Sequence, residues 1–168
     1  MFREYLDEVA SRAPASGVRL RVLGRCDRLP ADLLRAIQRA ESATVSGCAL
    51  QLRIAIDYSA RDAILQAARR LALGPPRASS RTKSGENETA EFSRLLAGGD
   101  AAPDVDLLIR TGGEQRLSDF LLWEIAYAEL YFTPKMWPDF EPSDLAAALR
   151  DFQARERRFG ALPHAATG

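Results

Sequence analysis

The sequence has few of the residues that build metal and disulfide sites. Its 168 residues include two cysteines and one histidine. Cys26 and Cys48 have neither C-x-x-C spacing nor the spacing of zinc ligands, and His164 lies close to the carboxyl terminus. A zinc site is therefore not expected, and two unpaired thiols are typical of a protein in a reducing cytoplasm.

Excess charge of one sign and long apolar runs are also absent. The sequence has 23 Lys and Arg against 23 Asp and Glu, so its formal net charge of +0 predicts no general attraction for nucleic acid. No apolar run reaches the length of a membrane span, and the first residues, MFREYLDEVASR, are too charged for a signal peptide. We expect a cytoplasmic protein with at most peripheral membrane contact.

The apolar content is sufficient for one substantial core. At 46% hydrophobic residues, the sequence predicts a single domain over residues 1–168. Segment 74–87 is rich in Pro, Ser, Gly and basic residues, which predicts a flexible loop, and 161–168 predicts a disordered tail.

Helix and strand patterns alternate along the chain. Apolar spacing predicts helices that begin at the amino terminus and at Pro30, further helices over 63–73, 88–96 and 120–128, and a last helix after 142. Strands are predicted over 18–23, 49–56, 105–109 and 129–132. The short run 105–109 is apolar apart from Asp106, and such runs are typical of strands that are buried on both faces of a parallel sheet. The predicted fold class is therefore α/β, a mostly parallel sheet flanked by helices.

The residues best suited to ligand binding directly follow the strand 105–109. Residues 110–118 read RTGGEQRLS, and ligands of open α/β sheets lie outside the carboxyl ends of the strands. Arg110 and Arg116 carry planar guanidinium groups that match phosphate oxygens, while Gly112 and Gly113 allow the main chain to approach a ligand closely. The loop therefore favours an anion, and specifically a phosphate.

The helix predicted over 120–128 strengthens this interpretation. Ser118 and Asp119 stand where that helix should begin, so its unpaired N–H groups and positive dipole end would point at the same ligand. The alternative is that the arginines form structural salt bridges and that Ser118 only caps the helix.

The stretch DLLIRTGGEQRLSDFLLWEIAYAELYFTPKMWPDF resembles the C-terminal signature of the cis-prenyltransferases, the undecaprenyl diphosphate synthase family. The resemblance implies that Arg110, Arg116 and Ser118 bind the diphosphate of isopentenyl diphosphate. It also implies that Glu129 belongs to a site for Mg²⁺ and isopentenyl diphosphate. One departure is Asp119, where the family usually has Asn.

Two further segments match the family in part. The segment ARERRFG resembles its closing R-x-G motif at Arg158 and Gly160, which clamps a substrate diphosphate, often across a dimer interface. Without the resemblance, these basic residues would only complement the negative end of a helix. Residues 57–61 read DYSAR where the family usually has N-Y-G-G-R, so Arg61 is expected to be structural.

The family motif D-G-N-x-R-W, whose aspartate holds Mg²⁺ beside the allylic diphosphate, does not occur in this sequence, and neither does S-x-E-N-W. The resemblance therefore implies an undecaprenyl diphosphate synthase-like fold that lacks its first strand or strands. The implied reaction is cis-prenyl chain elongation, in which isopentenyl diphosphate condenses with an allylic prenyl diphosphate to give a polyprenyl diphosphate, with Mg²⁺ as cofactor. The absent aspartate brings the activity of the chain alone into question.

Three interpretations remain open at this point. The chain is a cis-prenyltransferase whose true start lies upstream of Met1, or a fragment of one. Alternatively, it is a non-catalytic, truncated subunit or pseudoenzyme that dimerises with a complete homologue. The third interpretation is an anion-binding α/β module without transferase activity. In the first two, the expected partner chain is a second copy or a complete homologue.

Overall fold

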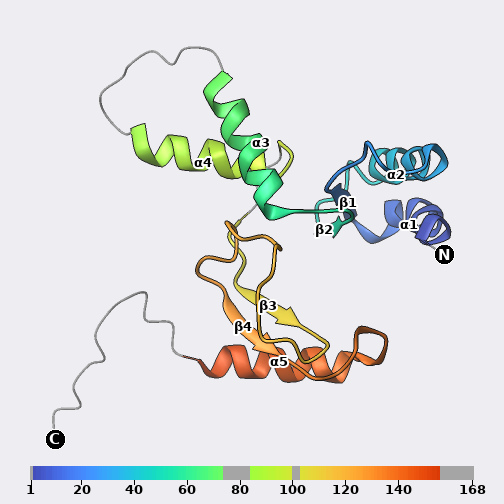
Figure 1. Cartoon of the computed structure of the whole chain (residues 1–168). Coiled ribbons are helices and arrows are strands. Elements are labelled where there is room, and N and C mark those ends of the chain that lie inside the picture. The colour runs from blue at the N-terminus through green and yellow to red at the C-terminus, as the bar shows by residue number, and fades with distance from the viewer. Residues whose placement is uncertain (1, 74–83, 100–102, 156–168) are drawn as a thin grey trace, which may run out of the picture. The chain divides into compact units, whose positions relative to one another are not determined.

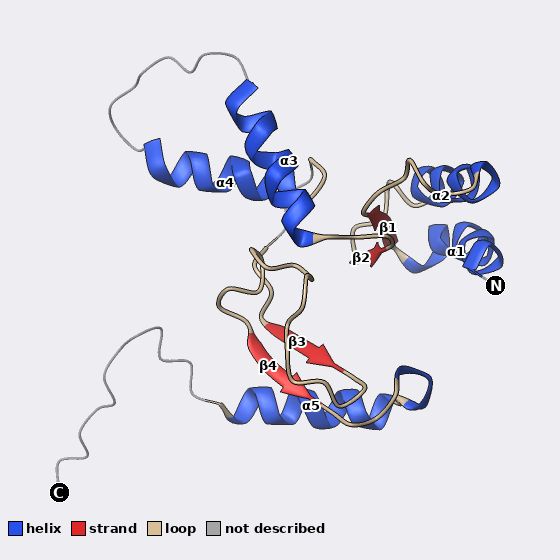
Figure 2. Ribbon diagram, in the orientation of Figure 1, coloured by secondary structure: helices blue, strands red, loops and turns tan. Residues whose placement is uncertain are grey.

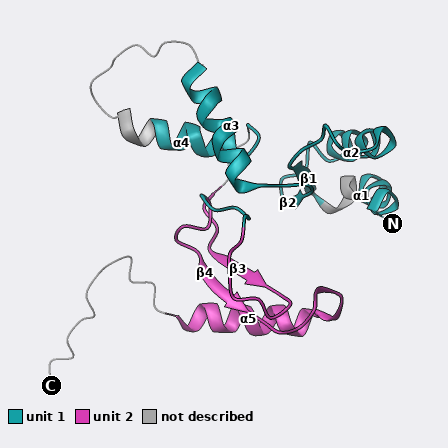
Figure 3. Ribbon diagram, viewed as in Figure 1, with its two compact units in different colours: residues 1–102, 119–123 teal, residues 103–118, 124–168 magenta. Residues whose placement is uncertain are grey.

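A computed structural model of the chain describes residues 2–73, 84–99 and 103–155 (Figure 1). The chain divides into two compact units (Figure 3). Unit 1 takes in residues 1–102 and 119–123, and unit 2 takes in 103–118 and 124–168. The single domain expected over 1–168 stays a prediction.

Unit 1 alternates helices with strands, as its apolar periodicity predicts (Figure 2). Its elements are α1 (Phe2–Ser16), β1 (Val18–Leu23), α2 (Ala31–Ala43), β2 (Leu50–Ala55), α3 (Ala60–Leu73) and α4 (Ser84–Leu96). Strands β1 and β2 pair in parallel, from Val18 opposite Leu50 to Leu23 opposite Ala55. The parallel pairing and the flanking helices confirm the predicted α/β class.

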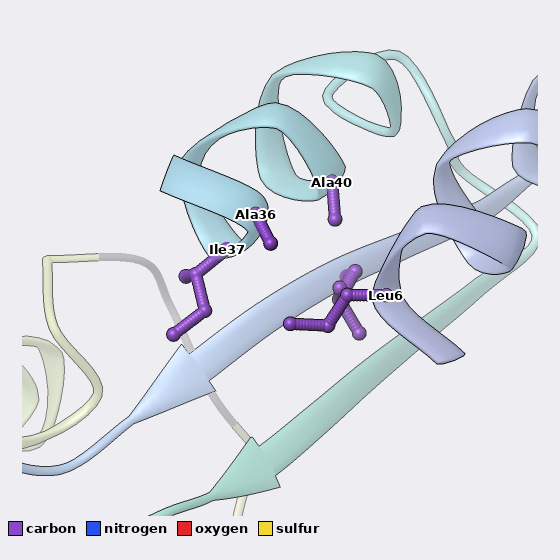
Figure 4. Packing of buried hydrophobic residues seen from close by; sticks show 5 residues of the cluster. Leu6, Ala36, Ile37 and Ala40 are labelled. Carbon is purple, nitrogen blue, oxygen red and sulfur yellow. The ribbon is translucent and has the colours of Figure 1, made fainter. Parts of the chain in front are cut away.

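The core of unit 1 forms where α1 and α2 pack on β1. Leu6 of α1 and Leu20 of β1 are fully buried, and Ala36, Ile37 and Ala40 of α2 join them. Figure 4 shows Leu6 beside these three α2 side chains. Alanine at two of the α2 positions lets the helix approach closely, and burial of the apolar side chains is the main stabilising term.

Side chains of α2 cover the outer edge of β1. The N–H of Leu20 donates to Thr44 Oγ1 at 3.0 Å, and the N–H of Val22 donates to Glu41 Oε1 at 2.9 Å. Thr44 is 1% exposed, and its hydroxyl in turn donates to the carbonyl of Ala40 at 2.8 Å. Glu41 of α2 and Thr44, the residue that follows the helix, therefore bind the strand amides that do not point at β2. On an uncovered edge these amides would be open to other chains.

Glycine is required where the chain leaves β1. Gly24 has φ of +116°, and a Cβ atom there would lie 2.0 Å from the carbonyl oxygen of Ile56. The main chain that follows β2 therefore passes too close to Gly24 for any side chain to fit there.

The second pair of helices in unit 1 is longer than the sequence indicates. Helix α3 begins at Ala60, three residues before the expected start, and α4 begins at Ser84. Residues 84–87 of the expected loop 74–87 are therefore helical, while 74–83 and the expected tail 161–168 lie outside the described residues.

Unit 2 contains β3 (Leu107–Arg110), β4 (Glu129–Phe132), the short 3₁₀ helix η1 (Trp137–Asp139) and α5 (Pro142–Ala154). The two strands pair in parallel, from Leu107 opposite Glu129 to Arg110 opposite Phe132. At the start of α5 a capping box joins Glu141 and Asp144, with Pro142 as the first helical residue. These elements hold the predicted phosphate loop at one end of the strand pair.

The predicted helix over 120–128 is wrong. Residues 118–127 form turns and bends, and Leu121 has φ of +46°, which an α-helix does not allow. The segment is also only partly buried, because Phe120 is 42% exposed and Tyr127 is 77% exposed. A helix dipole therefore makes no contribution to the candidate anion site.

Candidate functional site

The loop after β3 is fastened to the segment after β4 by main-chain hydrogen bonds. The N–H of Gly112 donates to the carbonyl of Lys135 at 2.7 Å, and the N–H of Gly113 donates to the carbonyl of Thr133 at 2.9 Å. Both glycines have positive φ, +89° and +78°. The left-handed conformation of the two glycines turns the chain sharply after β3. The rest of the loop therefore lies at the carboxyl end of β3, where ligands of open α/β sheets bind.

The structure brings together the residues predicted to bind diphosphate. Arg110 Nη1 donates to Ser118 Oγ at 3.1 Å, and it also donates to the carbonyl oxygen of Arg116. The loop thus folds back so that its last residue meets its first. Arg110, Arg116 and Ser118 form what we call the Arg–Ser cradle, a group of guanidinium and hydroxyl donors within one nine-residue loop.

Within the cradle, the guanidinium of Arg116 pairs with the carboxylate of Glu114. The Arg116 side chain is 64% exposed and that of Glu114 is 45% exposed. Exposed ion pairs contribute little to stability, so a doubly charged anion can replace Glu114 at small cost. The alternative interpretation, structural salt bridges, describes this contact but does not account for the convergence of Arg110 on Ser118.

Ser118 does not cap a helix in this structure. Its φ is +56°, in the left-handed region, and turns follow it. Its hydroxyl is instead placed against Arg110 in the cradle. The capping role that the sequence left open for Ser118 is therefore excluded, and the hydroxyl is available to an anion as a donor.

Glu129 lies at the opposite end of the strand pair from Arg110. It is the first residue of β4 and pairs with Leu107, whereas Arg110 is the last residue of β3. Three residue steps along a strand separate these ends by about 10 Å. The cradle and the predicted metal ligand therefore do not meet within this unit.

The surroundings of Glu129 do not by themselves fit a magnesium ion. Its carboxylate accepts a hydrogen bond from Arg155 Nη1 at 2.8 Å. Among residues 2–73, 84–99 and 103–155, no group of three or more His, Cys, Asp or Glu side chains is placed to hold a metal ion. A single carboxylate already paired with a guanidinium supplies too few oxygen ligands for Mg²⁺.

The remaining predicted site residues, Arg158 and Gly160, lie outside the described residues. The part of the chain that the structure describes includes no helix long and apolar enough to cross a bilayer.

The sequence did not reveal a contact between Asp119 and the amino end of α3. Asp119 Oδ2 accepts from the hydroxyl of Ser59 at 2.6 Å, and Oδ1 accepts from the N–H of Arg61 at 2.9 Å. The Ser59 hydrogen bond, followed by that from Arg61, lowers the pKa of Asp119 below its ordinary value. Ser59 also accepts from the N–H of Asp62 at 3.1 Å, so its hydroxyl caps the amino end of α3.

A pocket of about 510 Å³ opens in unit 1 at the carboxyl ends of β1 and β2. Its charged lining is largely paired: Arg25 with Asp27 at 2.7 Å, and Asp57 with Arg28 at 2.9 Å. Asp57 has φ of +47° and replaces the Asn of the family pattern. The pocket is lined by both acidic and basic side chains. A diphosphate site needs an excess of cationic donors, which the cradle offers and this pocket does not.

Comparisons with known proteins agree with these features. Residues 1–160 match the model of the undecaprenyl diphosphate synthase family, Prenyltransf. Isoprenyl transferase 1 of Bradyrhizobium diazoefficiens is 54% identical over 162 residues, which cover 96% of this chain and 62% of that protein. Isoprenyl transferase of Geobacter sulfurreducens is 44% identical over 161 residues, covering 95% and 64%.

Two solved structures share the fold. A probable undecaprenyl diphosphate synthase from Campylobacter jejuni has 34% identity and a TM-score of 0.74, covering 94% of this chain and 70% of that one. Lavandulyl diphosphate synthase from Lavandula x intermedia, solved with dimethylallyl diphosphate, has 32% identity and a TM-score of 0.81, covering 95% and 68%.

The chain spans between 60 and 65% of the length of the curated relatives it matches. The family match nevertheless extends over almost the whole of this chain and includes both strands that frame the cradle. On these grounds the chain belongs to the undecaprenyl diphosphate synthase family of prenyltransferases.

Proposed function

We propose that this chain contributes the isopentenyl diphosphate half of a site for cis-prenyl chain elongation. The observation that carries the proposal is the convergence of Arg110 on Ser118 beside Arg116, at the carboxyl end of β3. Family membership supplies the reaction class, and the cradle supplies donors of the type and number that a diphosphate requires.

In the proposed reaction, isopentenyl diphosphate condenses with an allylic prenyl diphosphate. The double bond of isopentenyl diphosphate attacks the allylic carbon, the bond from that carbon to diphosphate breaks, and loss of a proton completes the new double bond. The cradle's part is to hold isopentenyl diphosphate by its diphosphate, so that its double bond stays in one position. Arg110 and Arg116 bind charged oxygens, and Ser118 donates its hydroxyl.

Mg²⁺ is the proposed cofactor, and Glu129 would be one of its ligands, although Glu129 by itself supplies too few oxygen atoms to hold the ion. Mg²⁺ would neutralise diphosphate charge as it accumulates on the leaving group. Glu129 is paired with Arg155, and no further acidic groups gather around it in the described residues.

We propose a homodimer, or a heterodimer with a complete homologue, as the working form. Exposed apolar side chains on unit 2 support this, since Trp137 is 74% exposed, Tyr127 is 77% exposed and Met136 is 59% exposed. A cytoplasmic location is proposed because Cys26 and Cys48 are free, exposed thiols.

The test is a condensation assay with farnesyl diphosphate, labelled isopentenyl diphosphate and Mg²⁺. Labelled polyprenyl product from the purified chain alone supports autonomous elongation and excludes the non-catalytic subunit. Product that appears only with a complete homologue, and changes in amount when this chain is added, supports the subunit alternative. If the chain neither gives product nor binds isopentenyl diphosphate, the proposal is contradicted, and of the three interpretations only an anion-binding module for another anion is left.

A further inference from the structure

The loop that carries the cradle lies against the segment 133–136, which directly follows β4, and both belong to unit 2. The N–H of Gly112 donates to the carbonyl of Lys135 at 2.7 Å. The N–H of Gly113 donates to the carbonyl of Thr133 at 2.9 Å. We call residues 133–136 the support segment, because both amides at the turn of the cradle loop bind to it.

The side chain of Lys135 joins the support segment to the amino end of α5. Its Nζ donates to Asp144 Oδ2 at 2.8 Å, and the same oxygen accepts from the N–H of Glu141 at 2.9 Å as part of the capping box. The hydrogen bond from Lys135, followed by that from Glu141, lowers the pKa of Asp144 below its ordinary value. Lys135 thus meets Gly112 with its main chain and a charged carboxylate of the helix with its side chain.

The other end of α5 is fastened to β4, so the helix is a firm attachment for Lys135. Arg155, which follows α5, donates to Glu129 Oε2 at 2.8 Å and to the carbonyl of Leu130 at 3.1 Å. Both of these residues belong to β4. The support segment is therefore held from two directions, by the strand that it continues and by the helix through the ion pair of Lys135 with Asp144.

We infer that Lys135 and Asp144 are positioning residues for the cradle. Their ion pair keeps the main chain of Lys135 where its carbonyl accepts from Gly112, and this contact sets the turn that begins the loop directly after Arg110. In this role neither side chain contacts the ligand. The inference rests on the proposed function, because the cradle is taken to bind isopentenyl diphosphate.

Two other roles for Lys135 make different predictions. If its ammonium group binds the diphosphate directly, Asp144 competes with the ligand for it, and removal of the Asp144 charge should tighten binding. If the ion pair only stabilises the fold, its removal should leave the affinity of the folded protein unchanged. Positioning predicts instead that loss of either partner weakens binding, and that loss of the second partner adds nothing.

The experiment measures the Kd for isopentenyl diphosphate by calorimetry. Lys135→Met keeps the aliphatic part of the side chain, and Asp144→Asn keeps an acceptor for the Glu141 amide. Because the pair is partly exposed, at 44% and 23%, both variants should fold. We expect each substitution to raise the Kd about threefold, and the double variant to raise it no further. Lys135→Arg keeps a charged donor for Asp144 and should bind almost as tightly as wild type.

Amide hydrogen exchange at Gly112, followed by NMR without ligand, tests the geometry directly. Lys135→Met and Asp144→Asn should each speed this exchange about threefold, because the acceptor of the Gly112 amide is held less firmly. Asp7→Asn is the matched control. It breaks an exposed ion pair with Arg39, at 2.9 Å, that joins α1 to α2, so it should change neither the exchange rate at Gly112 nor the Kd.

Three results overturn the inference. Tighter binding by Asp144→Asn would show direct contact of Lys135 with the ligand, and a wild-type Kd in Lys135→Met would show a purely structural pair. Unchanged exchange at Gly112 in both variants overturns the inference whether or not isopentenyl diphosphate binds. A wild-type chain that binds no isopentenyl diphosphate overturns the proposed function instead, and the exchange rates then still decide whether the pair positions the loop.

Discussion

Arg155 connects the carboxyl end of α5 to the first residue of β4 by binding Glu129. Its Nη1 donates to Glu129 Oε2 at 2.8 Å and to the carbonyl of Leu130 at 3.1 Å, while Nη2 donates to Asp151 at 2.6 Å. The hydrogen bond to Glu129, followed by that to Asp151, raises the pKa of Arg155 above its already high ordinary value. The guanidinium therefore stays charged wherever the protein is folded.

This pairing predicts competition between Arg155 and any cation at Glu129. Replacing Arg155 by Ala removes the positive charge beside the carboxylate, so Mg²⁺ should bind several-fold more tightly. Titration of isopentenyl diphosphate at increasing Mg²⁺ measures this, with Arg150→Ala, on the same helix, as the control. Identical Mg²⁺ dependence in Arg155→Ala and wild type would mean that Glu129 is not the metal ligand.

Thr44 is predicted to be important for stability. Thr44→Val keeps the shape of the side chain but leaves the buried N–H of Leu20 without its acceptor, which should cost about 1–3 kcal/mol. Thr44→Ser keeps the hydroxyl and should cost less. Urea unfolding of both variants provides the comparison. Equal losses would show that the methyl group, and not the hydrogen bond to β1, is what matters.

Gly24 should tolerate no side chain. Gly24→Ala requires a φ near +116° that alanine rarely adopts, and its Cβ meets the carbonyl of Ile56. A loss of about 2–4 kcal/mol is expected. Gly99→Ala is a suitable control, since Gly99 has φ of +102° but nothing within 4 Å of the added Cβ. The unfolding midpoints should fall further for Gly24→Ala. If the unfolding midpoints of the two variants fall equally, the strained φ alone explains the loss of stability, and the close approach of Ile56 to Gly24 contributes nothing.

The lowered pKa of Asp119 predicts the direction of a pH effect. A carboxyl group whose pKa is lower in the folded than in the unfolded state stabilises the protein above its unfolded pKa, and this contribution is lost as the pH falls through the folded value. Stability curves of wild type and Asp119→Asn should therefore converge as the pH falls below about 4. A difference that stays constant from pH 7 to pH 3 would contradict the ionised contact.

The sequence predicts the regular elements of unit 1 well, because local periodicity determines them. Strand β1 occupies the expected residues 18–23. The sequence also places a strand directly before the loop 110–118, and the structure adds the contact of Arg110 with Ser118 within that loop. In these places, the residues that decide the structure are close together in the chain.

Distant contacts explain what the sequence did not predict. Residues 120–128 have strong helix-forming character, but Asp119 binds α3, Trp123 binds α4, and the carbonyl of Glu124 accepts from Val105 at 2.9 Å. These contacts override local propensity. The contact of Ser59 with Asp119 spans 60 positions, and the pairing of Glu129 with Arg155 spans 26, so no local pattern indicates either.

The most direct test of the account is calorimetric binding of isopentenyl diphosphate to wild type and to Arg116→Ala, with Arg150→Ala as a control. The Arg116 guanidinium pairs with the exposed carboxylate of Glu114, and the contact of Arg116 with Arg110 is through its main-chain carbonyl, so replacement of the side chain should leave the fold intact and remove one charged contact to the diphosphate. We predict binding by wild type and by Arg150→Ala, and a Kd raised about tenfold or more in Arg116→Ala. Equal affinity in Arg116→Ala and wild type would contradict the assignment of the cradle.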